Sequence, residues 1–255
     1  MKITAIIENR SKKDGIGSEH GLCLYIETEK RRILFDMGQT ELFSKNAAAL
    51  GIDLSEVDIA VLSHGHYDHG GGLAKFLDIN KKAPVYISKQ AFLPYFNGTE
   101  KYIGLDISLK NSDRLVFTDD TYEIESGLTL FSCNGEKRIH DLGSFGLTEK
   151  TENGFIPDRF LHEQYLLIED SVLISGCSHK GILNIAKWFE PKALVGGFHF
   201  SKLPLDDTLK GYAEYLACFD TDFYTCHCTG AEQYEFMKKY MPRLNYISAG
   251  DSIML

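Results

Sequence analysis

Short apolar runs recur along the chain, and charged or glycine-bearing segments separate them. Runs rich in β-branched and aromatic residues predict strands, and longer amphipathic stretches predict helices. The expected strands are residues 2–8, 22–28, 32–35, 58–62, 84–87, 115–117, 122–124, 128–131, 164–168, 172–175, 193–195, 223–225, 246–248 and 253–255. The expected helices run from Thr40 to Leu50, from 73 to 80, over 182–189, from Asp206 or Asp207 to Cys218, and over 231–240. We expect Thr40 to cap the first helix and Gly51 to end it.

Two long stretches show no period. Residues 93–113 contain Pro94, three aromatic residues and two glycines, and we expect an irregular excursion there. Residues 133–161 are charged and glycine-bearing, and we expect them to be irregular as well. Connections of this length are often lids or binding loops, so this second stretch is a candidate cover for a site. The alternative is a mobile surface insertion. The strands at 115–131 are expected to belong to a second sheet.

Length and composition fit one large α/β domain or two small ones. The chain has 255 residues, of which 44% are apolar, and no Pro/Ser-rich linker divides it. We therefore expect a single domain over residues 1–255. The net charge of −9 and the pI near 5.5 argue against a nucleic-acid partner, which usually requires a basic stripe.

The location is expected to be the reducing cytoplasm. The six cysteines lack the regular spacing of a disulfide framework. The first residues, Met-Lys-Ile-Thr-Ala-Ile-Ile-Glu, turn acidic too early for a signal peptide. No apolar run reaches the roughly 18 residues that a membrane span needs, so no membrane partner is expected. The sequence leaves the oligomeric state open.

Residues 63–72 contain the closest grouping of potential metal ligands in the sequence. His64, His66, Asp68 and His69 lie within this segment, between a strand-like run and a helix-like run. Neutral imidazoles and a carboxylate suit zinc, iron or manganese. Chain reversals at the glycines would bring close in space those side chains that are two and four positions apart in the sequence. The alternative is a polar turn that happens to be rich in histidine, but the position between strand and helix favours a metal site.

The order His-x-His-x-Asp-His resembles the signature of the metallo-β-lactamase superfamily. Other segments resemble one branch of it, which includes the archaeal dihydropterin ribofuranosylaminobenzene-5′-phosphate synthase and bacterial relatives. These segments are Leu-Phe-Asp-Met-Gly-Gln (34–39), Gly-Cys-Ser-His-Lys-Gly-Ile-Leu-Asn (176–184), Gly-Gly-Phe-His (196–199) and His-Cys-Thr-Gly (227–230). The resemblance spans residues 2–255. It implies an αββα sandwich, with two mixed sheets flanked by helices.

The resemblance also implies a ligand set. His64 and His66 would hold the first metal, while Asp68 and His69 would hold the second. Each metal then needs a further ligand from the distant half of the chain. The candidates are His179 for the first metal and His227 for the second, because each follows a strand and precedes a glycine and a helix. The alternative for each is an ordinary surface or core histidine.

Three further residues are expected near the metals. Asp36 ends a strand, and the superfamily uses an aspartate there to orient the histidine loop. His199 also ends a strand and would line the pocket, contact substrate or replace one of the other two distant histidines. Cys177 stands where most members place a metal-bridging aspartate. That departure puts the bridge, the filling of the second site and the metal's identity in question.

The remaining histidines and two cysteines receive structural roles. Cys226 and Cys228 are expected to pack, because a zinc ribbon needs two more sulfur ligands at matched spacing. The other histidines lack the context of a strand end and are expected at the surface or in a lid. They are His20, His140 and His162.

Several functions fit these residues. The first is a metal-dependent hydrolase acting through an activated water on a small anionic ester, lactone or phosphoester, with Asp68 as its catalytic carboxylate. The cofactor would be one or two divalent metals per chain, most readily zinc, with iron or manganese as alternatives. The second is a pterin-phosphate synthase, which the resemblance implies. An iron redox protein would usually need a flavin domain, for which the chain has no room. The last is a metal-stabilised module without catalysis.

Overall fold

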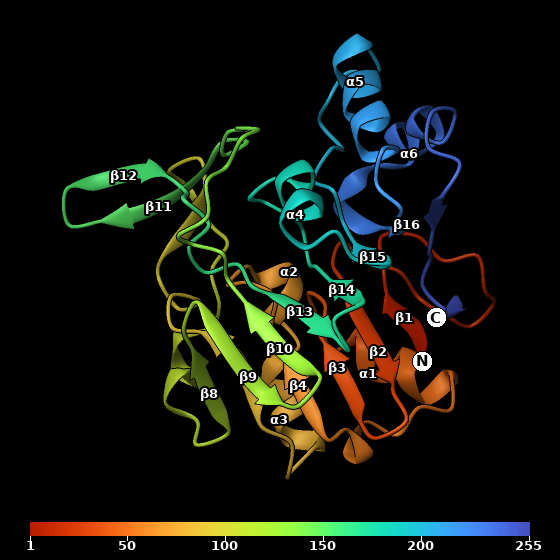
Figure 1. The fold of residues 1–255 in the computed structure, drawn as a ribbon. Helices are drawn as coiled ribbons and strands as arrows, with labels where there is room; N and C mark the ends of the chain where they lie inside the picture. The colour runs from red at the N-terminus through yellow and green to blue at the C-terminus, as the bar shows by residue number, and fades with distance from the viewer. The chain divides into compact units, whose positions relative to one another are not determined.

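The computed structural model describes residues 1–255, which divide by their internal contacts into two units (Figure 1). The first unit contains Met1–Asp119, Ser144–Gln164 and Ser248–Leu255. The second contains Asp120–Gly143 and Tyr165–Ile247. Each unit is built on a mixed seven-stranded sheet and has its own helices. This organisation confirms the α/β class.

The sheet of the first unit combines antiparallel and parallel strands. In order across the sheet its strands are β18 (Ser252–Met254), β1 (Lys2–Ile7), β2 (Cys23–Glu27), β3 (Arg32–Phe35), β4 (Ile59–Val61), β5 (Val85–Ser88) and β8 (Leu115–Thr118). The pairs from β18 to β3 are antiparallel, and those from β3 to β8 are parallel. Parallel neighbours end at the same edge of a sheet, so the residues after β3 and β4 meet there.

Helices of the first unit connect these strands. They are α1 (Leu42–Ala49), η1 (Leu54–Glu56), α2 (Tyr67–Gly70), α3 (Leu73–Ile79) and η2 (Ile107–Asn111). Phe43 of α1, Leu62 after β4 and Phe76 of α3 belong to one buried cluster. This packing holds the strand ends and the segment between β4 and α3 on a rigid base.

In the sheet of the second unit, the parallel strands come from the C-terminal part of the chain. In order its strands are β17 (Leu244–Tyr246), β16 (Asp222–Thr225), β15 (Ala193–Gly196), β14 (Val172–Ile174), β13 (Tyr165–Ile168), β10 (Leu128–Phe131) and β9 (Thr121–Glu125). The pairs from β14 to β17 are parallel. The helices are α4 (Ile182–Phe189), α5 (Asp207–Leu216), η3 (His227–Thr229) and α6 (Ala231–Met237). The carboxyl ends of β14, β15 and β16 therefore lie at one edge.

A small antiparallel sheet in the first unit corrects two sequence predictions. Its strands in order are β12 (Gly154–Pro157), β11 (Leu147–Thr151), β6 (Tyr95–Asn97) and β7 (Lys101–Tyr102). Residues 93–113 and 133–161 were both expected to be irregular, and each contributes a pair of strands. Alternation on a strand this short spans too few residues to stand out as a period. The β11–β12 hairpin is the green arm at the left of Figure 1.

Three smaller expectations also differ from the structure. Residues 115–117 form β8 of the first sheet rather than a strand of the second. Glu41 rather than Thr40 is the N-cap residue of α1, although the Thr40 hydroxyl accepts a hydrogen bond from the Leu42 amide at 3.1 Å. Gly51 has a positive φ after that helix, as expected of the residue that ends it.

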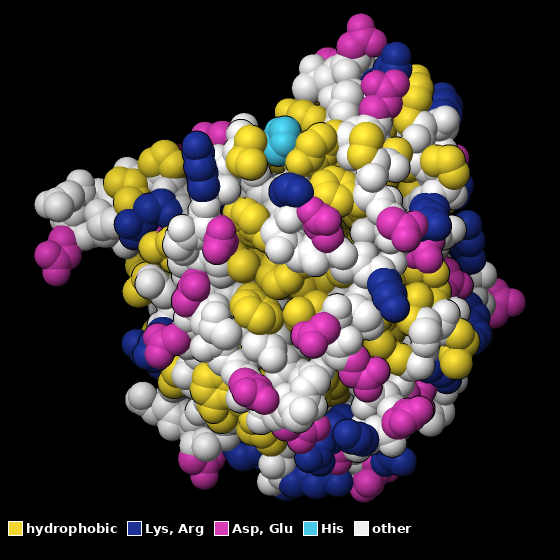
Figure 2. All heavy atoms as spheres, in the orientation of Figure 1, with side chains coloured by type: hydrophobic (Ala, Val, Ile, Leu, Met, Phe, Trp, Pro, Cys, Tyr) yellow, Lys and Arg dark blue, Asp and Glu magenta, His cyan; other side chains and the backbone are white.

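The surface mixes charge types. Acidic and basic side chains are interspersed with apolar ones over the face drawn in Figure 2. None of the helices has the length and apolar character needed to cross a membrane.

Candidate metal centre

The histidine segment of the first unit begins where β4 ends. Asp36 follows β3 directly, and its amide donates to the Val61 carbonyl at 2.9 Å. The parallel pairing of β3 and β4 therefore brings Asp36 beside Ser63 and His64. Asp36 has φ near 60°, a left-handed conformation that is uncommon outside glycine. Such strain is often found where a side chain must be aimed at a functional site.

Asp36 anchors the histidine segment through a buried network. Its Oδ1 accepts from the Ser63 amide at 2.7 Å, and its Oδ2 accepts from the Ser63 hydroxyl at 2.7 Å and from His69 Nδ1 at 2.6 Å. Because the Ser63 hydroxyl donates to Asp36, it accepts from His64 Nδ1 at 2.7 Å. Both Nδ1 atoms thus carry protons, and Nε2 is the nitrogen that His64 and His69 present to a metal.

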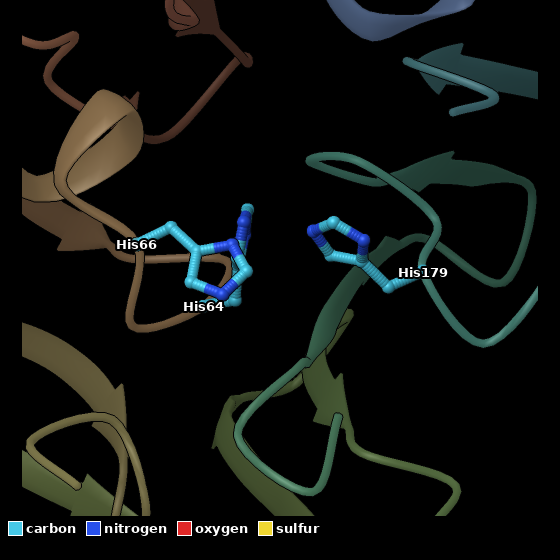
Figure 3. A group of neighbouring side chains, drawn as sticks. All are labelled: His64, His66 and His179. Carbon is cyan, nitrogen blue, oxygen red and sulfur yellow. The ribbon is translucent and has the colours of Figure 1, made fainter. Parts of the chain in front are cut away.

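The three histidines of the segment lie close together and are buried. The ring centroid of His64 is 4.6 Å from that of His66 and 4.1 Å from that of His69. Figure 3 shows His64 and His66 rising from the segment after β4. Asp68 Oδ2 lies 3.7 Å from His69 Nε2 and 3.3 Å from Nε2 of the half-exposed His20. The structure thus brings all four predicted ligands of this segment into one cluster.

The glycines of the segment allow close approach to neighbouring backbone. The chain bends at His64–Gly65 and turns at Gly71–Gly72, and none of Gly65, Gly71 and Gly72 has a positive φ. The short helix α2, between these bends, contains Asp68 and His69. A Cβ at Gly65 would lie 2.1 Å from the Ala91 carbonyl oxygen, and one at Gly71 would lie 2.1 Å from a backbone oxygen. The segment can pack against its neighbours only because these positions lack a side chain.

His162 is buried against the histidine segment, which corrects its expected surface or lid position. Its Nδ1 accepts from the Gly65 amide at 2.8 Å, and its Nε2 lies 3.2 Å from Asp158 Oδ2. The same carboxylate oxygen lies 3.5 Å from His66 Nε2. The sequence gave no signal for this contact, because His162 and Gly65 are 97 positions apart and no strand end precedes His162.

Burial and charge act in opposite directions on this pair. Burial lowers the pKa of His162 and outweighs the neighbouring Asp158, which raises it. Burial alone would raise the pKa of Asp158, but hydrogen bonds from His162 and His66 and the charges of both rings bring it well below its usual value. Asp158 is therefore a buried carboxylate that stays ionised at neutral pH.

The second unit gathers its own candidates at the ends of β14, β15 and β16. Ligand atoms of Cys177, His179 and His199 lie within 4.8 Å of one another, and so do those of Cys177, His227 and Cys228. The rings of His179 and His199 have centroids 4.4 Å apart. The five side chains therefore form one cluster around Cys177, as their positions after neighbouring parallel strands require.

Local backbone strain accompanies this second cluster. Ser178, His199 and His227 all have φ between 49° and 58°. Tight left-handed turns re-aim side chains at a strand end, and three of them in one cluster point to a constrained site. Figure 3 shows His179 on the turn that joins β14 to α4.

Cys228 has more than the packing role expected of it. The His199 amide donates to its sulfur at 3.3 Å. Burial would raise the pKa of the Cys228 thiol, but hydrogen bonds with Cys177 and His199 and the charge of His227 lower it well below its usual value. Cys226 is buried as expected. The predicted ligands His64, His66, Asp68 and His69 lie in the first unit and the predicted ligands His179 and His227 in the second, and each unit gathers its own cluster.

The sequence of the chain matches one family over most of its length. A profile of the metallo-beta-lactamase superfamily matches residues 16–210. The chain belongs to this superfamily. Two relatives from Methanocaldococcus jannaschii extend the match. The uncharacterized protein MJ0448 is 30% identical over 240 residues, covering 89% of this chain and 90% of the relative.

The second relative has a named reaction. It is 7,8-dihydropterin-6-methyl-4-(beta-D-ribofuranosyl)-aminobenzene-5′-phosphate synthase, 29% identical over 265 residues, covering 92% of this chain and 90% of the relative. Among solved structures, Tm1679, described as a metal-dependent hydrolase of the beta-lactamase superfamily, matches with a TM-score of 0.84 and 29% identity. That match covers 100% of this chain and 99% of the other. The metallo-β-lactamase fold and the resemblance to the synthase branch are thereby confirmed.

Proposed function

We propose that the protein is a metal-dependent hydrolase of a small anionic ester, lactone or phosphoester. The observation that supports this best is the buried network around Asp36. It fixes the protons of His64 and His69 on Nδ1, so that Nε2 would be the nitrogen each ring offers to a metal. Buried histidines oriented by a carboxylate in this way are typical of metal sites.

The donor chemistry fits a divalent cation. In the proposal His64, His66 and His179 hold a first metal, and Asp68, His69 and His227 hold a second. Imidazole and carboxylate donors are the usual zinc ligands, and iron and manganese accept the same set. Cys177, in place of a bridging aspartate, would add a soft thiolate donor beside His179. One or two metals per chain are expected, with the second bound more weakly.

The protein's residues supply orientation and proton handling. Bound metal would lower the pKa of a water and polarise a substrate oxygen. Asp68 reaches the cluster through Oδ2, and we assign it the role of accepting the proton of the attacking water. His20 Nε2, at 3.3 Å from that oxygen, is placed to exchange the proton with solvent, because more than half of its side chain is exposed. His199 would line the substrate pocket beside His179.

A synthase is the second candidate. The match to the named relative covers 92% of this chain at 29% identity, and the compound in the relative's name contains a dihydropterin and a ribofuranosyl-aminobenzene phosphate. The same metal ligands would then serve a transfer between two substrates. A dihydropterin that protects the protein against thermal unfolding would favour this candidate over simple hydrolysis.

The test begins with metal content. The purified protein should contain zinc, iron or manganese by elemental analysis, and the loaded protein should hydrolyse members of a panel of phosphoesters, esters and lactones. Asp36→Asn should lower metal content and turnover together, because it replaces the acceptor of His69 Nδ1 by an amide. Asp53→Asn is the matched control, since Asp53 caps an exposed turn. Metal binding without turnover on any substrate would favour the non-catalytic module.

A further inference from the structure

Two buried cysteines of the second unit lie close together at the end of β15. Cys177 follows β14 and Cys228 lies in η3 after β16, and β14 and β16 are the two strands that flank β15 in the sheet. The two sulfur atoms and a ring nitrogen of His227 all lie within 4.8 Å of one another. Three potential metal ligands therefore meet here without any residue of the first unit.

A pair of glycines at the end of β15 makes room for these ligands. A Cβ on Gly197 would lie 2.4 Å from the Cys228 sulfur. A Cβ on Gly196 would lie 2.1 Å from the Ser175 carbonyl oxygen, shortly before the turn that carries Cys177. Because both positions lack a side chain, the segments that follow β14 and β16 can approach each other over the end of β15.

The Cys228 sulfur lies beside polar groups in a firmly held turn. It accepts a hydrogen bond from the His199 amide at 3.3 Å. The Phe198 amide donates to the Thr229 hydroxyl at 2.8 Å, which ties the turn that carries Cys228 to the residues after β15. Cys23, in contrast, is packed among apolar side chains of the first unit. Polar contacts therefore contribute to the position of the Cys228 sulfur, as they do for metal ligands in general.

We propose that Cys177, His227 and Cys228 form a site for a thiophilic divalent cation, which zinc would fill. Two thiolates balance the charge of such a cation, so a buried ion does not remain an isolated charge. Ligand atoms that share a tetrahedral zinc are about 3.5–3.8 Å apart, so these atoms need to move by only about 1 Å. His199 supplies the fourth ligand, because its ring nitrogen lies within 4.8 Å of the Cys177 sulfur.

This site goes beyond the two metals of the proposed function. Cys228 has no part in those metals, and the site needs no ligand from the first unit. His227 is shared, so a cation held by the two sulfurs competes with the proposed second metal for this ring. Soft thiolate ligands favour zinc over magnesium or manganese, so the two sets of ligands differ in the metals that they select.

Cobalt(II) is the probe for this site. Thiolate ligands give bound cobalt a charge-transfer band in the near ultraviolet, which imidazole and carboxylate ligands do not give. Metal-depleted protein titrated with Co²⁺ should show this band, and Zn²⁺ should displace it. Cys228→Ser and Cys177→Ser should each lose about half of its intensity, because each removes one of two sulfur ligands. Gly197→Ala should also weaken the band, because its methyl group takes the space of the Cys228 sulfur.

Three control variants separate ligand loss from other effects. Cys218→Ser removes an exposed thiol that follows α5, and it should leave the band unchanged. Cys23→Ser buries a hydroxyl in the apolar cluster of the first unit, so it should lower stability and keep the band. Asp36→Asn, which disturbs the ligands of the first unit, should keep the band as well.

The results for this site and for the proposed function can be told apart. Absence of the thiolate band in the wild type, or an undiminished band in Cys228→Ser, would overturn the inference whatever the activity of the protein. A wild type that shows the band and hydrolyses none of the substrates would overturn the proposed function and would still support the site at Cys177, His227 and Cys228.

Discussion

At the scale of single residues, hydrogen-bond partners decide what each ligand can do. Asp36 and Ser63 orient the rings of His64 and His69 through hydrogen bonds, while the Asp158 carboxylate faces His66. Asp68 differs from all of these, because its carboxylate belongs to the cluster and lies close to ring nitrogens of His20 and His69. It is therefore the residue to which the proposed function gives both metal binding and proton transfer.

Asp68→Asn keeps the shape of the side chain and removes its charge. Two divalent cations at the usual ~3.5–4 Å repel each other, and a carboxylate ligand offsets part of that repulsion. We expect the variant to lose the second metal and to lower turnover by about 10²–10⁴-fold. Metal stoichiometry, activity and circular dichroism measure the three effects. Two tightly held metals with near-normal turnover would show that the role assigned to Asp68 is wrong.

At the scale of elements, the sequence predicted most of the framework. The helix at 182–189 and the strand at 32–35 have the expected limits, because each is a strongly apolar run with clear ends. The β11–β12 hairpin was not predicted. Its strand β11 has only two buried positions, one of them the charged Glu149, and β12 has none. Pairing with β6, which is distant in sequence, stabilises it instead.

The site could be predicted only in part for a related reason. His64, His66, Asp68 and His69 are adjacent in sequence, and the resemblance names them. The structure places them in one cluster with Asp36. Asp158 and His162 could not be found, because a contact between segments that follow different strands leaves no local pattern. Their partner Gly65 looked like a turn residue, while the structure assigns it to close packing.

Gly65→Ala tests that packing. The new methyl group would lie 2.1 Å from the Ala91 carbonyl oxygen, so the backbone on one side must move. We expect a loss of about 1–3 kcal/mol in the free energy of unfolding, together with weaker zinc binding. Urea denaturation and chelator competition measure these. Gly135→Ala is the control, because a Cβ there has nothing within 4 Å. Equal stability of both variants would contradict the packing role.

The hairpin itself should act on substrate rather than on metal. Its turn, between β11 and β12, lies apart in sequence from the residues that reach the histidine segment. Shortening the turn at residues 152–153 should change KM or substrate preference by several-fold and leave zinc content unchanged, as for a loop that controls access. Steady-state kinetics on an identified substrate, with metal analysis, makes the comparison. Unchanged kinetics would argue against an access role for the hairpin.

At the scale of the whole molecule, the proposed metals would raise the stability of the folded chain. Ligands held in the folded chain are dispersed in the unfolded one, so bound metal stabilises the folded state. Zinc at about 1,000 times its dissociation constant should add roughly 4 kcal/mol. Chelation should therefore lower the melting temperature by several degrees, and zinc should restore it. A melting temperature independent of zinc and chelator would contradict a tightly bound metal.

The first unit is not continuous in sequence, and this has a consequence for synthesis on the ribosome. Residues 1–119 emerge first and include the whole histidine segment. Asp158 and His162 follow only after the first strands of the second unit have been made. Chains grow at about 5–20 residues per second. Several seconds therefore pass between synthesis of the histidine segment and synthesis of Asp158 and His162, which contact His66 and Gly65. During that interval the proposed cation site would be incomplete, so we expect metal to be bound late in folding.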